Sequence, residues 1–227
     1  MRSTPIPADR IDHLVMSRFE GYTGPSSSTK EHEAFCADLK ALFNKGQVFD
    51  AEHFQQYSIP TLLHYLQATH QFYLNKRLAE IELSVSHMLK ELPEKNQWAT
   101  FLDKFLKSYE IELREHIEDE ETNLFPYIEA LICTKKEKKL SFLFSQKIRL
   151  INFLLNHDHK IEDNLGQLIM VLRKKYDQFN DSFSFRMLLI QLEAFELDLV
   201  IHAKIEEEVL MPLALQLEKE TLENSSF

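Results

Sequence analysis

The sequence predicts an all-α fold: an antiparallel up-down-up-down four-helix bundle with an N-terminal helical extension. The 227 residues include 44% hydrophobic residues but only 4 Gly and 7 Pro, a composition that favours helices over a sheet with many turns. Apolar residues also recur at helical spacing along four long stretches. The length allows one main core with an appended segment.

Residues 1–58 are predicted to be an N-terminal arm and helical extension. GYTGPSSSTK, residues 21–30, holds two of the four glycines and is typical of a loop. Phe35, Leu39 and Phe43 then follow a helical pattern, Gly46 indicates a helix stop, and FDAEHF indicates a new start. We expect this extension to pack on the outside of the main domain.

Residues 59–220 are predicted to form the bundle. The first stretch ends near Pro93, the second in TKKEKK, and the third near KKYDQFND. Residues three, four and seven apart share one face of a helix, so each stretch has a single apolar stripe. Four amphipathic helices of about 25 to 30 residues with modest connections make a four-helix bundle. The stripes include Leu63, Leu74, Ile81 and Met88; Leu102, Leu113 and Ile128; Ile151, Leu165 and Leu172; Leu188, Leu199 and Leu213.

Charge and cysteine content exclude several classes of partner. The formal charge of −10 argues against nucleic acid or an anionic membrane. Cys36 and Cys133 are far apart and form no CxxC pair, so neither a disulfide framework nor a thiolate metal site is indicated. No apolar run has the ~18 residues of a membrane span and no signal region is visible. We therefore expect a cytoplasmic protein.

Polar side chains interrupt the apolar stripes at corresponding places. HIEDEETNLFP begins at His116 and HAKIEEEVLMP at His202, and both read H, three residues, E, three residues, L, one residue, P. Helical phase directs His116 and Glu120, and likewise His202 and Glu206, towards the core. His70 occupies the same kind of position in the first stretch.

Two buried glutamates need a compensating cation. A carboxylate in the core costs several kcal/mol unless its charge is neutralised, and no Lys or Arg is expected in the same stripes near these positions. Imidazoles and bridging carboxylates that converge in a bundle core are typical of a binuclear iron centre. Zinc fits less well, because four ligands complete its usual site.

The third stretch offers two candidate ligands. His157 and His159 lie about 200° apart on a helix and cannot both point at one centre. His157 lies about 65° from the middle of the stripe and His159 about 135°. Helical phase therefore favours His157.

Other residues receive simpler interpretations. His87 is about 25 Å along a continuous helix from His70, too far for the same site. His13, His32 and His53 are expected at the surface. Trp98, Tyr65 and Tyr73 are assigned to packing, Leu124 and Leu210 to the core, and Pro126 and Pro212 to a bend or end of a helix.

The paired motifs resemble those of the hemerythrin-like superfamily, and within it the di-iron proteins that repair damaged iron–sulfur clusters. The resemblance covers Ile59 to Leu217 and implies two irons, bridged by the glutamates and by an oxo or hydroxo group. The implied ligands are His70, His116, Glu120, His202, Glu206 and one third-helix histidine. In the family that histidine usually follows an acidic residue and precedes a leucine by six, an arrangement that His159 fits, so His157 and His159 both remain candidates.

The resemblance implies a function in nitrosative or oxidative stress. The expected ligands are O2, NO and peroxide, and the expected macromolecular partners are damaged iron–sulfur proteins. The alternative is a sensor or store that binds O2 or NO without turnover. HDH and HAKIE do not match the ligand spacings of oxygen-carrying hemerythrins, which favours repair over oxygen transport.

Overall fold

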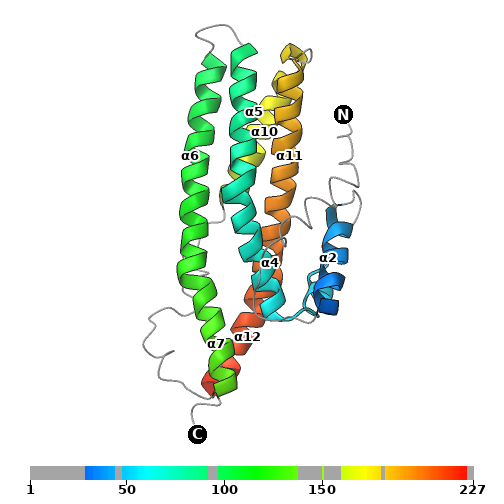
Figure 1. Cartoon of the computed structure of the whole chain (residues 1–227), viewed down its shortest axis with the longest axis vertical. Coiled ribbons are helices and arrows are strands. Elements are labelled where there is room, and N and C mark those ends of the chain that lie inside the picture. The colour runs from blue at the N-terminus through cyan, green and yellow to red at the C-terminus, as the bar shows by residue number, and fades with distance from the viewer. Residues whose placement is uncertain are drawn as a thin grey trace. The chain divides into compact units, whose positions relative to one another are not determined.

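A computed structural model of the chain describes residues 29–43, 48–91, 97–137, 150, 160–179 and 182–223. These residues form helices and connections, with no strand among them (Figure 1). The all-α prediction is therefore confirmed. The helices are α2 Thr29–Phe43, α3 Ala51–Phe54, α4 Ile59–Phe72, α5 Leu78–Glu91, α6 Gln97–Asp119, α7 Phe125–Glu137, α10 Lys160–Phe179, α11 Phe183–Lys204 and α12 Met211–Glu223, with π-helical segments η1 Tyr73–Arg77, η2 Glu120–Leu124 and η3 Ile205–Leu210.

The chain divides into two compact units. Unit 1 comprises Met1–Thr69, Glu118–His157 and Ile201–Phe227, and unit 2 comprises His70–Ile117 and Asp158–Val200. The divisions fall inside α4, α6 and α11, so each of these helices contributes to both units. The predicted domains 1–58 and 59–220, and the four-helix arrangement, stay predictions.

In unit 1, the predicted N-terminal helix is present as α2, and aromatic contacts hold it to the segment that follows. The buried Phe35 ring meets the rings of Phe54, Tyr57 and Tyr65 edge-on, at centroid distances of 5.9, 4.9 and 5.4 Å. The predicted new start at FDAEHF is α3, where Asp50 caps the helix by accepting a hydrogen bond from the His53 backbone N–H. Ring packing thus anchors α2.

Carboxylates of α2 add directional contacts to this packing. Glu31 accepts hydrogen bonds from the Ser58 backbone N–H at 2.7 Å and from the Thr61 hydroxyl at 2.9 Å. Both donors lie at the first turn of α4, where backbone N–H groups have no partner within the helix. Although burial acts to raise it, these hydrogen bonds lower the pKa of Glu31 below its ordinary value.

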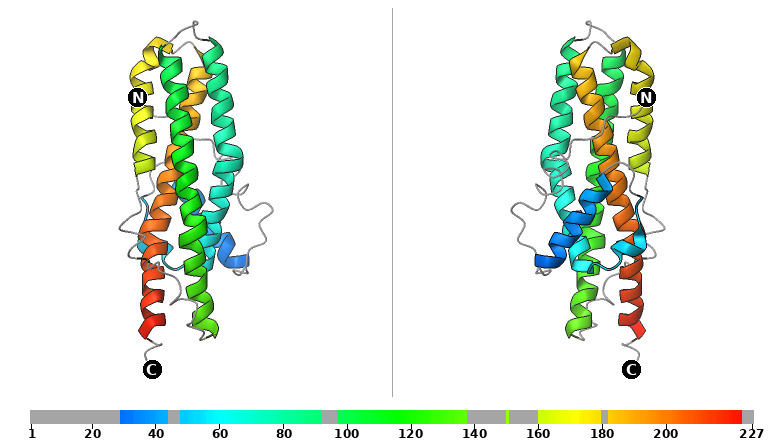
Figure 2. Two further views of the ribbon diagram at one scale, coloured as in Figure 1. Left: turned by 90° about the vertical axis from the view of Figure 1, so that its left-hand side faces the viewer. Right: turned by 90° about the vertical axis from the view of Figure 1, so that its right-hand side faces the viewer.

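Unit 1 also contains α7 and α12, which run alongside one another (Figures 1 and 2). α7 continues the helical run that carries His116 and Glu120, and α12 continues the run that carries His202 and Glu206. The Tyr127 hydroxyl donates a hydrogen bond to the Glu218 carboxylate at 2.6 Å, and both side chains are buried. A buried carboxylate is tolerated when it accepts such bonds.

Unit 2 consists of α5, α10 and the adjoining parts of α4, α6 and α11, which run alongside one another (Figure 1). The predicted stripe residues Ile81, Leu102, Leu113 and Leu188 are all buried. Asn164 donates a hydrogen bond to Glu112, and Arg173 forms an ion pair with Glu193 at 2.9 Å. Apolar packing inside and polar links outside agree with the amphipathic pattern.

No helix in the described ranges combines the length and the apolar character that crossing a bilayer requires.

A stacked histidine pair predicts a pH dependence of stability. His64 of α4 stacks on His32 of α2 with ring centroids 5.4 Å apart, and burial, followed by the proximity of His32, lowers the pKa of His64 from 6.5 to about 4. Between these two values the unfolded chain takes up a proton at His64 that the folded chain does not. The free energy of unfolding should therefore fall as the pH drops from 6.5 towards 4.

Urea denaturation at several pH values from about 7.5 down to about 4 measures this slope. The variant His64→Gln should flatten it, and His32→Gln should flatten it partly, because it removes only the neighbouring ring. An unchanged slope in His64→Gln would show that other groups carry the pH dependence.

Candidate metal centre

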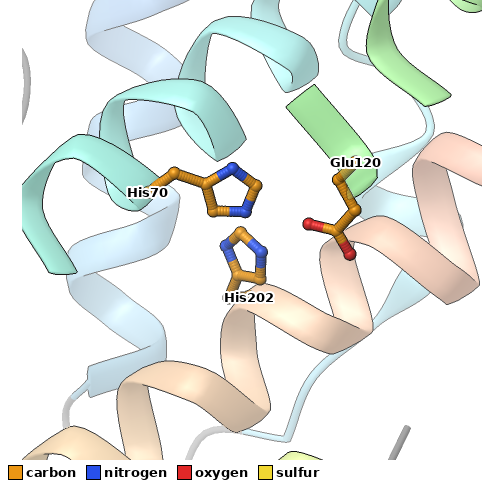
Figure 3. A group of neighbouring side chains, drawn as sticks. All are labelled: His70, Glu120 and His202. Carbon is orange, nitrogen blue, oxygen red and sulfur yellow. The ribbon is translucent and has the colours of Figure 1, made fainter. Parts of the chain in front are cut away.

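Three side chains that are distant in sequence meet at one point. His70 comes from α4, Glu120 is the first residue of η2, and His202 lies in the last turn of α11. One possible ligand atom from each lies within 4.8 Å of the others, and the three side chains point towards one another (Figure 3). All three residues are buried, with exposed fractions of 1%, 0% and 4%.

The geometry of the group fits a metal ion. Ligand atoms bonded to one ion at about 2.0 to 2.2 Å lie no more than about 4.4 Å apart. The three ligand atoms, all within 4.8 Å of one another, are near this limit, so a small closure of the side chains would bring them around one ion. Two imidazole nitrogens and a carboxylate oxygen are ligands that transition metals accept. The buried Glu120 carboxylate also gains a compensating charge from a cation. The group can therefore hold a metal ion.

The remaining predicted ligands differ in their burial and in their position relative to this group. Glu206 is buried, one turn after His202, and its Oε2 is 3.9 Å from the His202 Nε2. His116, one turn before Glu120, is only half-buried and does not belong to the group of three. His157 and His159 lie outside the described residues, so the choice between them stays open. The rejected His87 is exposed.

One residue assigned only to packing is a neighbour of the site. The Tyr65 ring is fully buried, and its centroid is 6.3 Å from that of His202. Tyr65 is five residues before His70, a spacing that does not place two residues on one helix face. For this reason the stripe pattern did not associate it with the histidines.

The prediction that no Lys or Arg occupies the inward stripes near the two glutamates stays a prediction, but one buried arginine lies further along the helical run of His70. Arg77 is buried in η1, seven residues after His70. Its guanidinium lies over the Phe72 ring at 5.3 Å and forms an ion pair with Glu80 at 3.2 Å. The contacts with a ring and a half-exposed carboxylate explain how a buried arginine is accommodated at this position.

Each helix that supplies a member of the group changes to π-helical geometry at the site. η1 begins three residues after His70, η2 begins at Glu120 itself, and η3 begins three residues after His202 and contains Glu206. A π turn inserts one extra residue into the helix and is often found at functional sites. The extra residue rotates everything beyond it by about 100° relative to an uninterrupted α-helix.

The two prolines of the repeated motif lie directly after π segments. Phe125 donates its backbone N–H to the Glu120 carbonyl, and Met211 donates to the Glu206 carbonyl, in both cases five residues back. Pro126 and Pro212 come next. A proline cannot donate to the carbonyl four residues earlier, which disfavours a regular α register at this point.

Of the two predicted outcomes, a bend or an end of a helix, the end does not occur, and the bend stays a prediction. α7 continues to Glu137 and α12 to Glu223, because the wider π turn takes up the interruption. Leu124 and Leu210 are fully buried, as predicted. A proline inside an otherwise amphipathic pattern, six residues after an inward glutamate, was the signal in the sequence that could have indicated the π turns. η1 has no such signal.

Comparison of the chain with protein-family models, with curated proteins and with solved structures found no significant match.

Removal of His70 tests the metal group. The variant His70→Ala should lose most of its bound metal, because one of three converging ligands disappears. Elemental analysis of the purified protein measures this, and His87→Ala is the matched control on the same continuous helical run, where the side chain is exposed. Equal metal content in both variants would argue against His70 as a ligand.

The π turn at Glu120 can be tested without touching a ligand. Pro126→Ala restores a backbone donor and should favour the α register, which moves Glu120 relative to the histidines. Metal affinity should fall on the order of tenfold while helix content stays the same. Pro60→Ala, at the second residue of α4 and 13 residues before the start of η1, is the control. Equal affinities for the two variants would mean that Pro126 does not position the site.

Proposed function

We propose that the chain is a hemerythrin-like di-iron protein in which four helices form a bundle around two irons. The supporting observation is the buried group of His70, Glu120 and His202. The resemblance of the two H-x3-E motifs to the hemerythrin-like superfamily selects iron among the metals that this donor set accepts. Glu206, with its Oε2 3.9 Å from the His202 Nε2, is the nearest further residue suited to a second ion.

The roles of the chain's own residues follow from their chemistry. His70 and His202 would each hold iron through one ring nitrogen, and Glu120 and Glu206 through their carboxylate oxygens. Iron, when bound, supplies redox chemistry towards O2, NO or peroxide. The fully buried Leu66 and Leu124, four residues from His70 and from Glu120 along their helices, would help to exclude water and limit access to small molecules.

In this proposal the protein acts in nitrosative or oxidative stress and supports the repair of damaged iron–sulfur clusters. Repair would require the iron to reach a protein partner or the reactive molecule to be removed at the site. Because the ligand side chains are at most 4% exposed, removal of a small molecule needs less rearrangement than transfer of iron.

The same burial supports a second candidate function. A site that admits only small molecules also suits a sensor or store that binds O2 or NO reversibly, without turnover. The two functions differ in one measurable respect: a store returns the gas unchanged, whereas a reactive site consumes it.

The first experiment is metal analysis of freshly isolated protein. About two irons per chain are expected from the number of predicted ligands. The variant Glu120→Gln keeps the size of the side chain but removes its charge and should lower the iron content, whereas the exposed Glu118→Gln should not. Stoichiometric zinc and no iron would overturn the di-iron assignment.

The second experiment separates the two candidate functions. Iron-loaded protein is mixed with a limiting amount of NO in a closed cell, and free NO is followed with an electrode before and after removal of gas under vacuum. Complete recovery of the NO supports a store. Consumption of NO, together with recovery of an NO-damaged iron–sulfur enzyme above that seen with His70→Ala protein, supports a function in repair.

A further inference from the structure

Unit 2 contains a partly open cavity of about 110 Å³ between α5, α6, α10 and α11. Its walls are mainly apolar and come from all four helices. Ligand pockets for ordinary metabolites measure about 300 to 1,000 Å³, so this cavity is too small for them. The aliphatic lining consists of Leu78, Ile81, Val85, Leu106, Leu165 and Leu192.

The polarity of the walls restricts the occupant further. An apolar cavity of similar size, about 150 Å³ in an engineered protein, stays dry and binds benzene or xenon. Against the aliphatic part of the walls water gains few hydrogen bonds, whereas a small apolar molecule gains by leaving water. The occupant should therefore be neutral, apolar and only a few atoms in size.

An aromatic contact connects the cavity to the helix that carries His70. Tyr109 and Phe195 line the cavity, with ring centroids 6.4 Å apart. The Phe195 ring also meets the Tyr73 ring edge-on at 5.1 Å. Tyr73 lies three residues after His70, so the two side chains are neighbours on one helix face.

Charged side chains surround the apolar walls. Glu82, Asp103, Lys107 and Glu110 belong to the lining, and Lys107 pairs with Asp103 at 2.9 Å. Glu110 pairs with Arg114 at 2.8 Å and Glu82 is exposed. The excess of carboxylates disfavours the approach of anions and leaves neutral molecules unaffected.

From size, polarity and position together, we propose that this cavity is a docking site for a neutral apolar diatomic gas, O2 or NO, which it holds close to the helix of His70. The choice of gas rests on the proposed function. The presence of the cavity does not rest on the proposed function, because its walls are formed without any metal. A gas held there would reach the metal site at a higher local concentration than in bulk water.

Xenon is the probe for the cavity, because it is neutral, apolar and small enough to fit. Methyl NMR spectra of the full-length protein, recorded at increasing xenon pressure, should show saturable shifts confined to the leucine, isoleucine and valine residues of the lining. Val85→Phe should abolish the shifts by filling the space, and Val85→Leu should weaken them. Leu83→Phe, two residues away and 58% exposed, should leave them unchanged.

The proposal is overturned if the wild-type protein shows no saturable shift, or if the shifts survive in Val85→Phe protein that retains its helix content.

Stopped-flow mixing of iron-loaded protein with NO then tests the connection between the cavity and the metal site. Val85→Leu should bind NO at least several-fold more slowly than Leu83→Phe, with equal iron content. Equal rates would overturn the docking role. If no iron binds but xenon does, the proposed function fails and the apolar cavity remains.

Discussion

The structure depends on how a carboxylate is accommodated in an apolar core. Glu120 has no exposed surface and Glu206 is 4% exposed, and each lies one helical turn after a histidine. A negative charge in such surroundings costs more free energy than a typical hydrophobic contact returns, so it persists where a positive charge or hydrogen bonds offset it. The two inward histidines near Glu120 could provide the other ligands of a cation, and a metal ion bound there would explain their joint burial.

The π segments give this arrangement its geometry. A regular α-helix presents side chains at fixed angular intervals, and a π turn changes the direction of the side chains beyond it. η1, η2 and η3 each add a residue within one turn of a member of the metal group. Pro126 and Pro212 lie where the missing backbone donor makes the wider turn less costly than a regular one. In both motifs the proline therefore accompanies a π turn that begins at the glutamate or one residue before it.

Burial also limits the chemistry. Side chains that are at most 4% exposed cannot contact a folded partner directly, so the immediate reactants at this site must be small. The cavity in unit 2 has the same preference, since its volume and its aliphatic walls favour neutral apolar molecules over metabolites. A role with O2, NO or peroxide is consistent with both features. Any role that involves iron transfer requires local opening of the helices that carry the ligands.

Sequence periodicity alone determined the all-α class, the positions of the long helices and the inward direction of four polar residues. This was possible because 3.6-residue periodicity places each residue on a known face of its own helix. His70, Glu120, His202 and Glu206 each continue an apolar stripe, and all four are buried as that pattern predicts.

Only the tertiary structure decided which of these residues meet. Phase along one helix does not give the height or the rotation of a neighbouring helix, and three π turns change that phase close to the site. The structure therefore joined His70, Glu120 and His202, left His116 half-buried, and brought Tyr65 beside His202 and Phe195 beside Tyr73. Contacts between helices depend on side-chain packing at each crossing, which a one-dimensional pattern does not contain.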